Sequence, residues 1–182
     1  MYLLLLHIIH DACIVSEVYF LRGYSVSDQR EIQEVLARYV RAADHRDGIA
    51  MSNLFLPEGR VDIFYNNAGI PEHLGELVGR EAIAAAVTTV MKPHPLRGWS
   101  HHTTHDPIVE VQGDIGTLDA QFIVFNIVGA EKPEGGWPKG VYGAQGKITP
   151  IESGYYRPIL KRVDGRWLMA NHRIYLDLPM AF

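Results

Sequence analysis

A change from helical to strand periodicity is the sequence feature that most constrains the fold of this chain. Over residues 32–43, apolar side chains recur at three- and four-residue spacing, which is typical of an amphipathic helix. Asp28 and Glu31 have the spacing of a capping box, and Gly48 follows the last apolar position. We therefore predict a long helix that begins near Ser27 and ends before Gly48.

The rest of the chain divides into short helices and a run of strands. Helical pattern returns twice, and alternating patterns bounded by turn residues predict strands. The expected helices are 50–55 and 79–92, and the expected strands are 60–65, 101–113, 116–128, 153–163 and 166–176. Residues 66–69 read as a turn, and a loop containing Pro71 is expected to follow. Gly113-Asp114 and Asp164-Gly165 are hairpin signals between these strands.

Helices first and strands later predict an α+β fold. A curved mixed or antiparallel sheet would wrap the long N-terminal helix, with two further helices, and leave a hollow at its mouth for a ligand. Residues 129–150, with a short strand expected near 141–142, are rich in glycine and proline. Such a long loop predicts a mobile lid or rim over the pocket.

Composition excludes several partners. The net charge is −4 and no basic stripe is visible, which argues against nucleic acid as a partner. Cys13 is the single cysteine, so we expect neither a disulfide framework nor a cysteine-based zinc site, and a cytoplasmic setting fits. The apolar run at residues 1–9 is too short to span a membrane. We interpret residues 1–26 as an N-terminal extension and 27–182 as one domain.

Five segments in this order resemble the SnoaL-like family. The segments are EIQEVLARYVRAADHRD, LFLPEGRVDI, GREAIAAAV, HHTTHDPIVEVQGDIGTLDAQFIVF and YYRPILKRVDGRWLMANHRIY. The resemblance covers roughly residues 28–176. It implies the cone-shaped fold that this family shares with nuclear transport factor 2, ketosteroid isomerase and scytalone dehydratase.

The same resemblance implies a catalytic pair. Among dehydratases of this superfamily, an aspartate late in the first helix orients a histidine at the start of a strand, and these positions match Asp44 and His102. His102 would act as general base, and Asp44 would fix its tautomer and stabilise its charged form. Tyr39 stands five residues before Asp44, a spacing also found in bile-acid dehydratases, and could assist a leaving hydroxyl. The alternatives are a solvated helix-end Asp44, a strand-edge His102 and a core Tyr39.

Other polar and aromatic residues are candidates for the pocket wall. Those expected to bind substrate are Tyr65, Trp99, Phe122, Asn126, Tyr142, Tyr156 and His172. The chain departs from scytalone dehydratase. The region that would carry a second catalytic histidine reads FIVFNIVG, with Asn126 as its polar group, and Ile63 stands in place of a strand tyrosine, with Tyr65 two residues on. No zinc-binding pattern fits the group of His101, His102, His105 and Asp106. Neighbouring residues of a strand point to opposite faces of the sheet, so His101 and His102 would not bind one metal ion together. We expect no metal and no cofactor.

The preferred function is a cofactor-independent lyase that performs a dehydratase-type elimination on a small hydrophobic, ring-containing polyketide- or steroid-like substrate. Two alternatives stay open. One is an isomerase or cyclase that uses the same proton transfers, and the other is a non-catalytic ligand-binding or assembly subunit. The resemblance further implies a homodimer or homotrimer.

Overall fold

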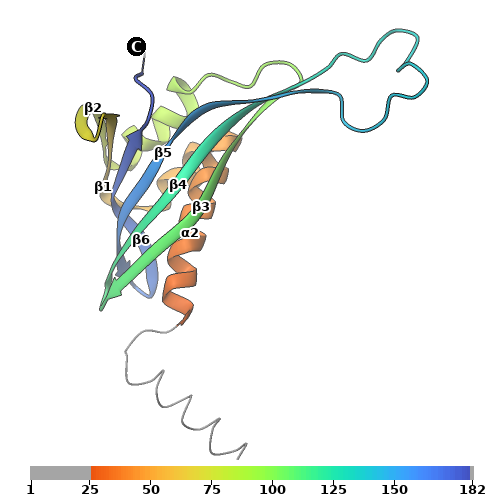
Figure 1. Ribbon diagram of the computed structural model, residues 1–182. Coiled ribbons are helices and arrows are strands. Elements are labelled where there is room, and N and C mark those ends of the chain that lie inside the picture. Colours follow the sequence, from red (N-terminus) through yellow and green to blue (C-terminus); the bar gives the residue numbers. More distant parts are fainter. Residues whose placement is uncertain (1–25, 181–182) are drawn as a thin grey trace, which may run out of the picture.

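The computed structural model describes residues 26–180 and has a strongly curved, unclosed sheet with helices along its concave side (Figure 1). Six strands form the sheet in the order β2-β1-β6-β5-β4-β3. The strands are β1 Phe55–Asn67, β2 Ile70–Val78, β3 Gly98–Gln112, β4 Ile115–Gly129, β5 Gly146–Val163 and β6 Arg166–Leu176. All neighbouring strands are antiparallel except β1 and β6, which run parallel.

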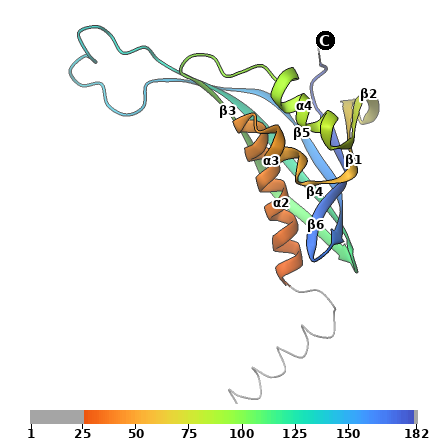
Figure 2. The same ribbon diagram turned by 180° about the vertical axis from the view of Figure 1, so that it is seen from behind.

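Three helices accompany the sheet. The helices are α2 Val26–His45, α3 Gly48–Ser52 and α4 Gly79–Ala85, and a π-helical turn, η1 Ala86–Val90, continues α4. Figure 2 shows α2 lying along β3, with α3 and α4 beside its C-terminal end. The α+β architecture expected from the sequence is thus confirmed, with a mixed sheet that curves around one long helix.

The core lies between α2 and the concave face of the sheet. Ile32, Leu36 and Tyr39 are buried at helical spacing on α2, and they meet alternate residues of the strands. Gly116 on β4 permits this contact, because a Cβ there would lie 2.4 Å from Cδ1 of Ile32.

Both predicted hairpin turns are confirmed. Gly113-Asp114 joins β3 to β4, and Asp164-Gly165 joins β5 to β6. Asp164 and Gly165 have φ angles of 50° and 73°, which is the pair of positive values that a type I′ turn requires. The tight turns fix the register of these strands, and β6 has the predicted bounds 166–176.

Several predicted elements were wrong in detail. The segment around Pro71 is not a loop but the edge strand β2. An edge strand tolerates a proline, because the backbone N–H that proline lacks would have no partner strand on the open side of the sheet. The short helix is 48–52 rather than 50–55, and the helix predicted at 79–92 is α-helical only to Ala85. The strand predicted at 60–65 extends from 55 to 67.

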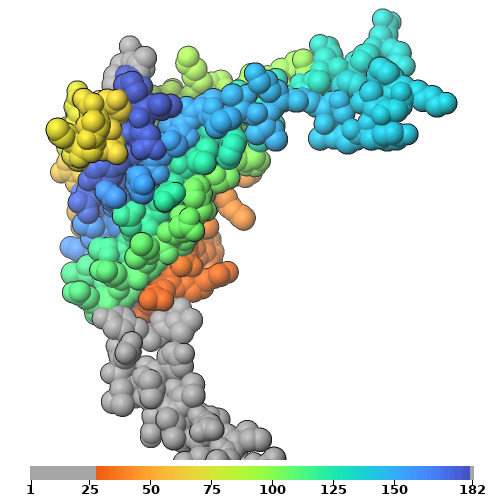
Figure 3. Space-filling model, viewed as in Figure 1, coloured from red at the N-terminus to blue at the C-terminus, as the bar shows by residue number. Residues whose placement is uncertain are grey.

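The long loop differs most from its prediction. Strands β4 and β5 remain paired as far as Gly129 and Gly146, so residues 130–145 extend beyond the end of the sheet, as Figures 1 and 3 show. No strand forms at 141–142, and no residue of this loop lines either of the hollows described below. The loop is therefore a projecting arm rather than a lid in this structure.

The predicted extension, residues 1–26, lies outside the described residues apart from Val26, where α2 begins. No helix between residues 26 and 180 is both long and apolar enough to cross a membrane.

Candidate functional site

His102 and Asp44 form a buried hydrogen-bonded pair between β3 and α2. Nδ1 of His102 lies 2.6 Å from Oδ1 of Asp44, and the side chains are only 12% and 8% exposed. The backbone amide of His102 also donates to both carboxylate oxygens, each at 3.2 Å. Because an ionised carboxylate only accepts, Nδ1 carries the proton and Nε2 is left as the basic nitrogen.

Two further groups fix the end of α2 against β3. The hydroxyl of Ser100 donates to Oδ1 of Asp44 at 3.4 Å, and Nε2 of His94 donates to the backbone carbonyl of Asp44 at 2.7 Å. The His94 ring in turn stacks on Trp99 with centroids 4.4 Å apart. Neither Ser100 nor His94 was predicted, because their partners come from distant parts of the sequence.

The charge state of Asp44 follows from these contacts. Burial alone would raise the pKa of its carboxyl, but hydrogen bonds from the ring and backbone of His102, together with the nearby His101 and His102 rings, outweigh burial and lower it. Nδ1 of His101 lies 3.7 Å from Oδ2 of Asp44 and its side chain is largely exposed. Asp44 is therefore a carboxylate that can orient His102 and stabilise its charged form.

The concave face of the sheet carries further polar groups in line with the pair. Register places His102 opposite Val124 on β4, and Val124 opposite Glu152 on β5. Ser100 is likewise opposite Asn126, so the predicted Asn126 lies on the same face. Glu152 was missed because the predicted strand began at 153, whereas β5 begins at Gly146.

Aromatic side chains form the floor of this region. Tyr39 packs edge-on against Tyr156 and His172, with ring centroids 5.6 Å and 4.4 Å away, and Tyr156 stacks on Phe122 at 4.0 Å. All four side chains are buried. Burial raises the pKa of Tyr39 and of Tyr156, and it lowers that of His172 to about 3. Both phenols therefore keep their protons, and His172 is neutral near pH 7.

The remaining predicted residues lie apart from this cluster. Tyr142 is 86% exposed on the projecting arm, so its assignment to the pocket was wrong. Trp99 is separate from the aromatic floor but lines the small hollow beside His102 and Asp44, where its ring contacts His94 and His45. Tyr65 is half-buried near the end of β1, paired with Leu176, and contacts none of the catalytic candidates.

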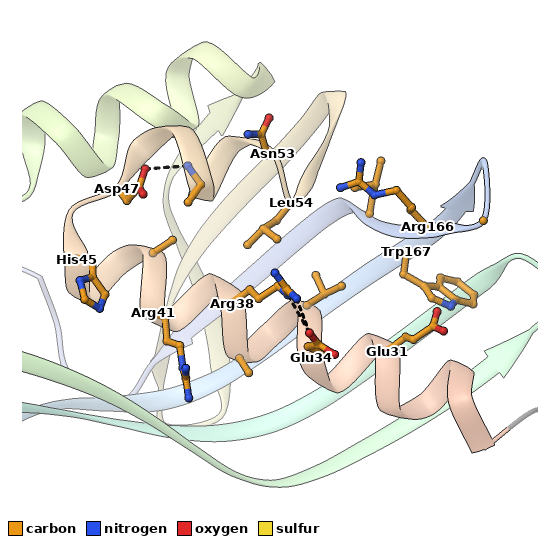
Figure 4. A pocket seen from close by; sticks show the side chains of 16 residues that line it. Glu31, Glu34, Arg38, Arg41, His45, Asp47, Asn53, Leu54, Arg166 and Trp167 are labelled. Carbon is orange, nitrogen blue, oxygen red and sulfur yellow. Dashed lines mark hydrogen bonds and ion pairs between the residues drawn. The ribbon is translucent and has the colours of Figure 1, made fainter.

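Two hollows are present along α2. The smaller, with a volume of about 370 Å³, adjoins the pair and is lined by Val40, Arg41, Asp44, His45, Trp99, His101, His102 and Thr103. The larger, about 1040 Å³, runs along the solvent side of α2, where Glu34, Arg38 and Arg166 point into it (Figure 4). The larger groove contains neither member of the pair, so we place the chemistry at the smaller hollow and the concave face behind it.

One group of side chains has the arrangement of metal ligands. Asp62, His73 and Glu76 approach one another between β1 and β2. Arg60 already balances one of the two negative charges, since its guanidinium pairs with both carboxylates, and Asn171 donates to Asp62 at 2.9 Å. These contacts satisfy the acidic groups without a metal ion.

The sequence matches a known protein family over most of its length. A family model described as the SnoaL-like domain matches residues 25–173. Among curated proteins, none matches the sequence significantly.

Solved structures share the fold at low sequence identity. A nuclear transport factor 2-like protein with a cystatin-like fold from Novosphingobium aromaticivorans is 21% identical, with a TM-score of 0.60 over 92% of this chain and 90% of that chain. A proposed dehydratase of the same fold family from Streptomyces avermitilis is 15% identical, with a TM-score of 0.57 over 84% and 98%. The beta subunit of a proposed aromatic-ring-hydroxylating dioxygenase, also from Novosphingobium aromaticivorans, is 15% identical, with a TM-score of 0.62 over 85% and 92%.

Proposed function

Because the chain belongs to the SnoaL-like family, we propose that it is a cofactor-independent lyase that performs a dehydratase-type elimination on a small hydrophobic, ring-containing ketone. The observation that carries this proposal is the buried contact of 2.6 Å between His102 and Asp44. A carboxylate hydrogen-bonded to one imidazole nitrogen leaves the other as a base and stabilises the imidazolium that forms. The surrounding aromatic rings suit an apolar ring-containing substrate.

The reaction begins with proton transfer from carbon. Nε2 of His102 takes a proton from the carbon next to the carbonyl, and the resulting electron pair forms the new double bond as the neighbouring carbon–oxygen bond breaks. Asp44 keeps the ring oriented and balances its positive charge. Tyr39, whose raised pKa keeps its phenol protonated, is a hydrogen-bond donor for a substrate oxygen.

A screen with two variants tests the base. Hydroxylated cyclic ketones and polyketide- or steroid-like compounds are incubated with the wild type, His102→Ala and Asp44→Asn, and the conjugated product is followed by its absorbance. We expect His102→Ala to lose about 10²–10⁴-fold or more in turnover, because general base catalysis contributes that much, and Asp44→Asn to lose less.

His105→Ala is the matched control, because His105 lies on the outward face of the same strand. It should retain wild-type turnover. Undiminished turnover in His102→Ala would exclude His102 as the base.

The same screen separates the alternative functions. An isomerase or cyclase would convert a substrate without loss of water and would still require His102. A ligand-binding or assembly subunit, the role suggested by the likeness to a dioxygenase beta subunit, would bind compounds without turning any of them over. The base held by a buried carboxylate favours an enzyme over the assembly role, because an assembly surface does not require such a pair.

A further inference from the structure

Glu152 is a carboxyl group on the concave face that the mechanism above does not use. It stands in one row with His102 and Val124 across three neighbouring strands. Adjacent strands are about 4.8 Å apart, so the Cα atoms of His102 and Glu152 are separated by roughly 10 Å. Two side chains that project from the same face at this separation can contact opposite sides of one small substrate.

The carboxyl of Glu152 has no protein partner to explain its place. It is partly buried, and no hydrogen bond or ion pair joins it to another of the residues 28–180. Burial raises its pKa, and the nearby His102 ring lowers it by a smaller amount. Partial burial of a carboxyl without a partner costs free energy of folding, and groups with shifted pKa values concentrate at functional sites.

The groups that face Glu152 come from three elements. They are His102 on β3, Tyr39 on α2 and Tyr156 on β5 itself, and the charge of Glu152 raises the pKa of both phenols. No Lys or Arg is among the groups that perturb Glu152. With no fixed cation beside it, the carboxyl keeps its proton to a higher pH than an ordinary glutamate.

We infer that Glu152 is the general acid that protonates the departing oxygen, opposite the base His102. The inference rests on the proposed elimination. His102 takes the proton from carbon, the carbon–oxygen bond breaks as the double bond forms, and the leaving oxygen takes the proton of Glu152, so that a hydroxyl departs as water. Proton transfer through solvent then returns His102 and Glu152 to their starting states. The reaction needs no oxidant, reductant or co-reactant.

A series of leaving groups tests this assignment without the natural substrate. The probes are two β-aryloxy ketones, a phenoxy butanone and its para-nitrophenoxy counterpart, and release of the phenol is followed by absorbance. Para-nitrophenolate is a weak base that departs readily without a proton, whereas the more basic phenoxide departs faster when an acid protonates it. Glu152→Gln should therefore lose about 10²–10⁴-fold in the rate of phenoxy ketone elimination and keep the wild-type rate with the para-nitrophenoxy ketone.

Matched variants and pH separate this role from a structural one. Glu110→Gln, an exposed change on β3, should leave both rates unchanged. Glu152→Asp should restore part of the phenoxy rate. The wild-type phenoxy rate should fall at high pH as Glu152 loses its proton, and Glu152→Gln should lack that fall.

Each outcome decides between the two proposals. If the wild type eliminates the probes, His102→Ala does not, and Glu152→Gln treats both leaving groups as the wild type does, then Glu152 is not the acid while the base stands. Equal losses on both probes in Glu152→Gln would also overturn the assignment. If the wild type eliminates neither probe faster than His102→Ala does, the lyase proposal fails and the role of Glu152 fails with it.

Discussion

At the scale of single residues, His172 is a titratable side chain that the fold removes from water. It is fully buried against Tyr39 and Tyr156, and neither ring nitrogen has a partner among residues 28–180. Burial lowers its pKa from 6.5 to about 3, so the folded protein holds it neutral where the unfolded chain would bind a proton. Its role in the fold is therefore linked to pH.

We expect His172 to make the protein less stable in acid. As pH falls from 6.5 towards 3, the unfolded state gains a proton that the folded state does not, so the free energy of unfolding falls by about 4–5 kcal/mol from this group alone. His172→Phe should remove that part of the pH dependence, whatever constant offset its packing adds. Urea denaturation at several pH values measures it, with His105→Phe as control. Parallel pH profiles for the wild type and His172→Phe would contradict the prediction.

Individual site residues could be predicted from the sequence only where neighbouring residues or the family resemblance indicated their positions. Asp44 and His102 were found because the resemblance supplied both positions. Glu152 could have been found from alternation, since Tyr156 and Leu160 share its parity and are buried, but the strand was started at 153. Tyr142 was misplaced because its aromatic type suggested a pocket while the strands on either side carry it outward.

At the scale of elements, an ion pair joins the start of α2 to the β5–β6 hairpin. Both oxygens of Asp28 accept from the guanidinium of Arg162, at 2.8 Å and 3.2 Å, and Trp167 lies beneath that guanidinium at 4.7 Å from its ring centre. Asp28 therefore does not form the expected capping box. The helix begins at Val26, so Asp28 lies in its first turn, and its side chain binds Arg162 on a distant strand. Local spacing predicted the helix start but not this long-range partner.

Removal of this ion pair should destabilise the protein. Asp28→Ala removes the buried carboxylate that Arg162 binds and leaves this guanidinium with the exposed Asp114 carboxylate and the carbonyl of Gly113. We expect a loss of about 1–3 kcal/mol in the free energy of unfolding. The exposed pair of Glu34 and Arg38 on the same helix provides the control, since Glu34→Ala should cost at most about 0.5 kcal/mol. Urea denaturation compares the two variants. A cost for Asp28→Ala no larger than that for Glu34→Ala would show that the pair does not anchor the helix.

At the scale of the whole molecule, the curvature of the sheet brings the site together. Strands β3, β4 and β5 place His102, Asn126 and Glu152 on one concave face, and α2 closes that face with Tyr39 and Asp44. The fold was predictable because the order of helical and alternating patterns allows few other architectures. The edge strand at Pro71 and the direction of the 130–145 arm were not, because they depend on pairing between segments far apart in sequence.

A mutant cycle on one probe tests the central claim, that His102 is the base and Asp44 acts through it. We would measure kcat/KM for elimination of the para-nitrophenoxy ketone by the wild type, Asp44→Asn, His102→Ala and the double variant. Residues that act as one unit have non-additive effects. We therefore predict that the double variant loses no more than His102→Ala alone, about 10²–10⁴-fold. Wild-type activity in His102→Ala, or losses that multiply in the double variant, would contradict the account.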